Sequence, residues 1–185
     1  MLTLDDAARD SFRSAVQAAG SRLAAARSAV APLRAGLAAA TAERRPVCVN
    51  SGRCCRFETY GHRLFVTPLE LAVVLADAAA LRRSPELAAA EAAWSGEGCP
   101  FQAGGGCGIH PHRPLGCRVY FCDETSDDWQ SQQYEAFHAG LKEAHTNLNV
   151  PYQYVEWREA LRAMSITAAG DRRTPGRHAL PVVSG

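Results

Sequence analysis

The chain has 185 residues, of which 47% are hydrophobic and 21% are charged, and its formal net charge is +1 at pH 7. This length and composition are typical of one globular domain with helical extensions. The balanced charge indicates no nucleic-acid partner, and no apolar run reaches the ~18 residues that a membrane span needs. The N-terminus shows no basic segment followed by an apolar one, so we expect no secretory signal and a cytoplasmic protein.

Residues 3 to about 41 are predicted to form one long helix or a bent pair of helices. Gly20 and Gly36 weaken this helix, and Pro32 is expected to kink it because it removes one backbone hydrogen bond. The apolar residues recur at alternating spacings of four and three, which gives a seam along one face. The seam residues are Phe12, Val16, Ala19, Leu23, Ala26, Val30, Leu33 and Leu37. We favour packing of this seam against its own domain; the alternative is a protein partner or a homodimer.

Two helix starts follow a short strand that is predicted at residues 64–66. Thr67 can cap a helix, Pro68 suits its first position, and Glu70 completes a capping box. The same Ser-Pro pattern at Ser84 opens a second helix that runs to about residue 94.

The C-terminal part predicts two more helices. Ser126, followed by Asp127 and Asp128, can cap the first, and Pro151 begins the last. Their apolar faces hold Trp129, Phe137, Leu141, Ala144 and Leu148 in the first and Val155, Leu161 and Met164 in the last. From Ala168 onward the sequence has no pattern, and we expect a flexible tail.

The predicted fold class is mainly α. It is a small helical domain around an irregular cysteine-rich metal-binding core, with a long N-terminal helix. The predicted segments are an N-terminal helical segment (1–46), the cysteine-cluster core (47–125), C-terminal helices packed on the core (126–167) and the tail (168–185).

All seven cysteines fall between residues 48 and 122, in two groups. They are Cys48, Cys54 and Cys55, and then Cys99, Cys107, Cys117 and Cys122. In a reducing cytosol clustered cysteines more often bind metal than form disulfides, and an odd number cannot pair completely. Residues 99–122 are also too rich in Gly and Pro for us to expect regular structure, and metal ligation would hold such a loop. We therefore predict that the two groups meet and bind metal, with inert or disulfide-bonded cysteines as weaker alternatives.

The cysteine spacing favours an iron–sulfur cluster or iron, with Zn²⁺ as the alternative. Thiolates select zinc, copper(I) and iron–sulfur clusters over hard cations. Structural zinc sites usually contain short Cys-x2-Cys pairs, which are missing here, and one zinc ion takes only four ligands. Cys117-x4-Cys122 fits iron–sulfur ligation loosely.

Other side chains beside the cysteines are candidates for supporting roles. Three arginines are cofactor-binding candidates: Arg56, Arg113 and Arg118. They could lower thiolate pKa values or donate to sulfur, or instead pair with carboxylates such as Asp123 and Glu124. His110 and His112 could ligate metal or lie in a surface loop. The sequence holds no known nucleotide-binding or hydrolase motif, so it identifies no catalytic residue.

The two cysteine groups resemble the YkgJ-like cysteine-cluster family, which carries a CxxCxxCC-type zinc- or iron-chelating domain. The resemblance covers roughly residues 48–122. The matching positions are Cys48, Gly52, Cys54, Cys55 and Arg56 in the first group, and Cys99, Pro100, Phe101, Cys107, Ile109, Arg113, Pro114, Cys117, Arg118 and Tyr120 in the second. Ser51 stands where the family has its second cysteine, which leaves the first group one thiolate short and makes Cys122 a candidate replacement.

This resemblance implies a metal-binding protein that holds an iron–sulfur or iron centre, with a redox or metal-handling role. One alternative is a structural zinc module for partner interaction. Another is an enzyme that uses the cluster in oxidoreductase or methylation-type chemistry, since a flagellin lysine methylase carries a similar cluster. No methyl-donor site is recognisable in this chain.

Overall fold

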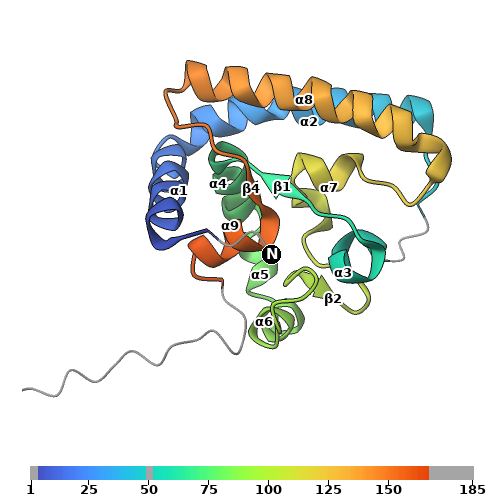
Figure 1. The fold of residues 1–185 in the computed structure, drawn as a ribbon, viewed down its shortest axis with the longest axis horizontal. Helices are drawn as coiled ribbons and strands as arrows, with labels where there is room; N and C mark the ends of the chain where they lie inside the picture. Colours follow the sequence, from blue (N-terminus) through green and yellow to red (C-terminus); the bar gives the residue numbers. More distant parts are fainter. Residues whose placement is uncertain (1–3, 49–51, 167–185) are drawn as a thin grey trace, which may run out of the picture.

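The computed structural model describes residues 4–48 and 52–166, and its fold is mainly α, as predicted (Figure 1). The helices are α1 (Asp6–Gly20), α2 (Leu23–Arg44), α3 (Phe57–Tyr60), α4 (Pro68–Asp77), α5 (Ala79–Arg82), α6 (Pro85–Ala92), α7 (Leu115–Val119), α8 (Asp127–Asn147) and α9 (Trp157–Ala163). Short 3₁₀ turns are η1 (Arg53–Cys55), η2 (His110–His112) and η3 (Glu124–Ser126), and the strands are β1 (Phe65–Val66), β2 (Gln102–Ala103), β3 (Gly106–Cys107) and β4 (Val155–Glu156). The predicted tail from residue 168 lies outside the described residues.

The N-terminal segment is the bent pair of helices rather than one long helix. The break falls directly after Gly20, where Ser21 and Arg22 separate α1 from α2. Helix α2 continues through Pro32, so the break between the two helices lies at the glycine and not at the proline. Glycine has a high conformational entropy in the unfolded chain and favours helix ends over helix interiors.

The apolar seam of these helices packs against the rest of the domain. Helix α1 contacts α4 and α9, and α2 contacts α4 and α8, which lies along it at one side of the molecule (Figure 1). The seam residues in the buried core are Phe12, Val16, Ala19, Ala26, Val30 and Leu37. The favoured interpretation of the seam is therefore confirmed, while a partner or homodimer through this segment stays a prediction.

The predicted strand at residues 64–66 is present as β1, and it pairs with a strand that the sequence did not reveal. Strand β4 runs antiparallel to it, with Phe65 opposite Glu156 and Val66 opposite Val155. This pairing joins two segments about ninety residues apart, so neither segment alone signals it.

The last helix begins later than predicted, at Trp157 instead of Pro151. Residue Glu156 explains the boundary, because its carboxylate accepts hydrogen bonds from the backbone N–H groups of Arg158 (3.0 Å) and Glu159 (3.2 Å). This is the role of an N-cap residue, and it fixes the first helical turn directly after the strand.

Helix α4 begins as predicted, at Pro68, with Thr67 as its N-cap residue. The Thr67 hydroxyl accepts the Glu70 N–H at 3.4 Å, as a cap should. The Glu70 carboxylate in turn interacts with the backbone of Thr67, as a capping box requires, and its Oε1 also accepts the backbone N–H of Leu115 at the start of α7. Glu70 therefore joins α4 to the helix that carries Cys117.

The segment between Cys99 and Cys122 is more regular than its composition suggested. Strands β2 and β3 form a small hairpin, and the turn between them places Gly104 and Gly105 at positive φ (55° and 80°). The turn η2 and helix α7 follow. The glycines thus form a defined turn, because they adopt the left-handed conformation without steric cost.

One buried core joins the N-terminal helices, the cysteine-bearing segment and the C-terminal helices. It includes Phe12, Phe57, Phe101, Leu115 and Trp157, all 2% exposed or less. Among the residues that the structure describes, no helix combines the length and apolarity needed to cross a bilayer.

Candidate functional site

The two cysteine groups lie side by side in the structure. Cys54 and Cys55 lie on η1, Cys107 on β3 and Cys117 on α7, while Cys99 precedes the hairpin. The Cys99 N–H donates to the Cys55 carbonyl at 2.8 Å, which joins the groups directly through the backbone.

A second bond joins the same two segments. The Gln102 side-chain amide donates to the Gly52 carbonyl at 3.4 Å. Gly52 has φ +67°, and a Cβ there would lie 2.3 Å from the Gly105 carbonyl oxygen. The close approach of the two loops therefore requires glycine at this position.

Five thiols from four segments interact around Cys55. Hydrogen bonding to Cys107, Cys54 and Cys99, together with burial, raises the pKa of the Cys55 thiol well above its ordinary value. Burial and the negative fields of Cys99, Cys107 and Cys54 raise the pKa of Cys117. Cys55 thus lies close to three other thiols, and Cys117 lies close to the same three.

The pKa values of two of these thiols are instead lowered. Hydrogen bonding with Cys55 lowers the pKa of Cys54 to about 6, against burial, and the Arg113 guanidinium lowers it further. Hydrogen bonding with Cys55 also lowers the pKa of Cys107, against burial, and the Ile109 N–H and Arg113 add to the effect. A thiolate is the form that binds metal, so the lowered pKa of Cys54 favours ligation near neutral pH, and the pKa of Cys107 is shifted in the same direction.

The remaining two cysteines are exposed, unlike the five around Cys55. Cys48 and Cys122 line a small cavity of about 30 Å³ together with Cys54 and Cys107. His110 also lines this cavity, and burial, with Arg113 and Arg118 nearby, lowers the pKa of its imidazole. Of the two predicted histidines, the structure therefore brings His110 beside the thiols.

The three predicted arginines differ in their roles. Arg113 acts electrostatically on the thiols and donates to the carbonyls of His110 (3.2 Å) and Cys117 (3.3 Å). Arg118 donates to the carbonyls of Arg113 (2.8 Å) and Pro111. The side chain of Arg56 is exposed, and it takes part in none of the hydrogen bonds or ion pairs of the described residues.

The alternative role of these arginines, ion pairing with nearby carboxylates, is not observed at Asp123. Its carboxylate binds the Val47 N–H at 3.2 Å and the side chains of Thr125 (2.6 Å) and Ser126 (3.0 Å). This network anchors the chain just before Cys48 to the turn just after Cys122.

Three residues that the sequence analysis missed support Cys99. The Trp157 indole N–H donates to the Cys99 sulfur at 3.4 Å, from 58 residues further along the chain. The Gly98 N–H donates to Glu58 at 2.8 Å, and Glu58 in turn pairs with the buried Arg158. These contacts depend on how distant segments of the chain pack together, so no pattern in the neighbouring sequence predicts them.

Across residues 4–48 and 52–166, no three or more His, Cys, Asp or Glu side chains are already arranged as a group that could hold a metal ion. All seven cysteines are free thiols, and the five around Cys55 interact with one another. The donor atoms suit a soft metal, and ligation would require these thiols to rotate and lose their protons.

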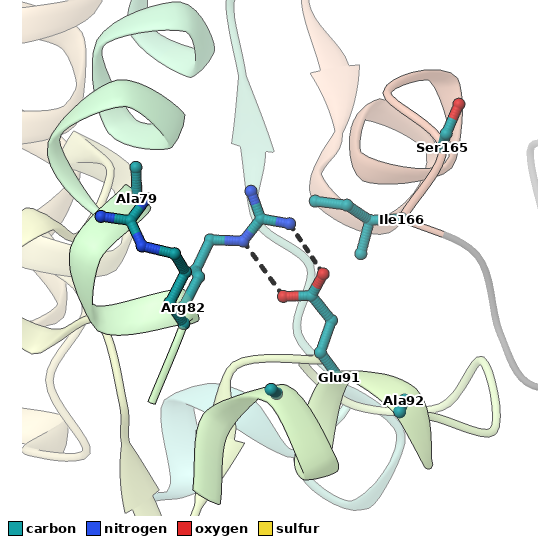
Figure 2. Close-up of a pocket in the computed structure, with 8 residues that line it drawn as sticks. Ala79, Arg82, Glu91, Ala92, Ser165 and Ile166 are labelled. Carbon is teal, nitrogen blue, oxygen red and sulfur yellow. Dashed lines mark hydrogen bonds and ion pairs between the residues drawn. The ribbon is translucent and has the colours of Figure 1, made fainter. Parts of the chain in front are cut away.

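A separate pocket of about 480 Å³ lies away from the cysteines, between α5, α6 and the end of α9 (Figure 2). Three charged residues line it, Arg82, Arg83 and Glu91, and Arg82 makes two hydrogen bonds to Glu91, at 2.7 and 3.0 Å. The pocket wall is otherwise formed by residues such as Ala79, Ser165 and Ile166. It therefore offers no cluster of reactive groups comparable to the thiols.

Comparison with known proteins found no match among family models, curated proteins or solved structures. The resemblance to the YkgJ-like family accordingly stays a prediction that is based on the cysteine motif.

Proposed function

We propose that the protein is a cytoplasmic metal-binding protein of the YkgJ-like type that holds an iron–sulfur or iron centre, with a redox or metal-handling role. The observation that supports this most is the gathering of five thiols from four chain segments around Cys55. A purely structural core would gain more from aliphatic side chains, because crowded thiols bury weakly hydrogen-bonding groups.

Electrostatics supports the same proposal. Packing several ionisable sulfurs together makes it costly for all of them to be charged, as the raised pKa values of Cys55 and Cys117 show. A bound cation removes this repulsion and takes the place of the thiol protons. Arg113 adds one positive charge to the same side of the group.

The candidate ligands are the five thiols of the inner group, which we define as Cys54, Cys55, Cys99, Cys107 and Cys117. A bound iron–sulfur cluster would supply one-electron transfer. The chain itself would hold the sulfurs in place through Arg113, Arg118 and the Trp157 N–H, and helix packing would exclude water from the inner side.

Anaerobic purification followed by metal and sulfide analysis tests this proposal. Iron and sulfide in a brown protein with broad visible absorption would support the leading form. A colourless protein with about one zinc per chain would assign the same thiols to a structural zinc module instead.

Substitution of single cysteines tests which of the inner thiols bind metal. We expect Cys55→Ser and Cys117→Ser each to lose bound metal and to lower the melting temperature, since metal binding stabilises the folded state. The control is Ser131→Ala, which removes a hydroxyl from a neighbouring surface pocket that none of the inner thiols lines. Unchanged metal content in both cysteine variants would contradict the ligand assignment.

A further inference from the structure

The exposure of the seven cysteines separates them into two sets. Cys55 is buried and the other members of the inner group are half-buried. Cys48 and Cys122, which we define as the outer pair, are both exposed. They come from opposite ends of the cysteine-bearing region, and the Asp123–Val47 bond brings their backbones together.

The small cavity joins the two sets. Its wall contains both members of the outer pair and also Cys54 and Cys107. These last two thiols also hydrogen-bond with Cys55 at the centre of the inner group. A continuous series of sulfurs therefore runs from solvent, through the cavity, to Cys55.

The size of the cavity limits what can enter it. It measures about 30 Å³, whereas a single water molecule needs roughly 10–15 Å³ by the same kind of measure. The cavity therefore admits a metal ion with one or two waters, while Cys48 and Cys122 also line more open surface pockets of about 540 and 530 Å³, respectively. Two thiols and water form a weak, reversible site, in keeping with a point of passage rather than storage.

We infer that the outer pair is the entry site of the metal centre, where a soft metal ion first binds before thiol exchange moves it to Cys54 and Cys107. This inference rests on the proposed function. As each inner thiol binds the ion, it gives its proton to water, and the bond between the ion and Cys48 or Cys122 breaks. The released outer sulfur takes up a proton, so the exchange needs no oxidant or reductant.

Zinc uptake by the metal-free, full-length protein tests this route, with Zn²⁺ as the probe. The double variant Cys48→Ser/Cys122→Ser should bind as much zinc as the wild type but take it up, and release it to a chromogenic chelator, about tenfold more slowly, which corresponds to ~1.4 kcal/mol in the barrier. The comparison variant Cys55→Ser should instead bind less zinc.

The outcomes separate this inference from the proposed function. Wild-type rates in the double variant, or a loss of bound zinc, would overturn the entry role, the latter by making the outer pair resident ligands. A wild-type protein that binds no zinc, iron or cluster would overturn both.

A measurement on the wild type avoids any effect of substitution on folding. Brief treatment of the zinc-loaded protein with iodoacetamide should label Cys48 and Cys122 first, as mass spectrometry of peptides would show. The labelled protein should keep its zinc and release it more slowly to the chelator. Zinc loss in step with this labelling would refute the entry role.

Discussion

The buried carboxyl of Glu70 allows a prediction whose size follows from the structure. Glu70 is 1% exposed, and burial raises its pKa from 4.5 to about 7, although the Leu115 N–H, Arg34 and Arg118 partly oppose this. We consider the substitution Glu70→Gln, which removes the titrating group. It keeps a side-chain oxygen that can accept the Leu115 N–H.

The raised pKa determines the sign of the effect. The folded protein holds the Glu70 proton more tightly than the unfolded chain does between pH 4.5 and about 7. The free energy of unfolding therefore falls as pH rises through this window, by about 3 kcal/mol for a shift of this size. The glutamine variant lacks this loss, so its stability should decline less than that of the wild type.

Urea denaturation of both proteins at pH 5 and pH 8 measures the effect. Other groups, such as Cys54, also titrate in this range, but their contributions cancel in the difference between the two proteins. The matched control is Asp77→Asn, because burial would raise the pKa of Asp77 but hydrogen bonds from Arg34 and Arg27 lower it overall. This control should parallel the wild type between pH 5 and 8. Parallel curves for Glu70→Gln and the wild type would refute the reasoning.

Two further predictions concern the loops around the thiols. Gly52→Ala should lower the free energy of unfolding by more than ~3 kcal/mol and reduce metal content, because it combines left-handed strain of about 1–2 kcal/mol with a clash against Gly105. The control is Gly61→Ala, since Gly61 has the same φ of +67° but a Cβ there would meet nothing within 4 Å. Its free energy of unfolding should fall only by the backbone strain. Equal destabilisation of the two variants would contradict the clash with Gly105. Trp157→Phe should cost about 1 kcal/mol and weaken metal retention through loss of the bond to the Cys99 sulfur. Chelator competition checks this, and unchanged retention would count against a role for the indole.

Local signals were enough to predict where several elements begin. The hydroxyls of Thr67 and Ser84 cap their helices as expected, and each is followed by proline at the first helical position. Helix α8 begins at Asp127 as predicted, although the Ser126 hydroxyl donates to Asp123 instead of capping. These boundaries depend on neighbouring residues, so the sequence alone reveals them.

The remaining features depend on distant contacts. Strand β4 exists only because β1 lies beside it, and its Glu156 then delays the last helix. The convergence of the two cysteine groups was predicted from chemistry, but their division into an inner group and an outer pair follows from burial. The capping box predicted a local role for Glu70, but this carboxyl lies inside an otherwise apolar run and also binds the Leu115 N–H, 45 residues away, which no local pattern predicts.

The hydrogen bonds of the loop that leads to Cys117 indicate which part of the site a bound metal would stabilise. Its composition suggested that ligation holds it, yet its backbone carbonyls accept bonds from Arg113 and Arg118. The Leu115 N–H is also bound, by Glu70. These hydrogen bonds come from the protein itself, so we expect the metal-free protein to keep the fold of this loop, unlike small zinc domains that unfold without metal.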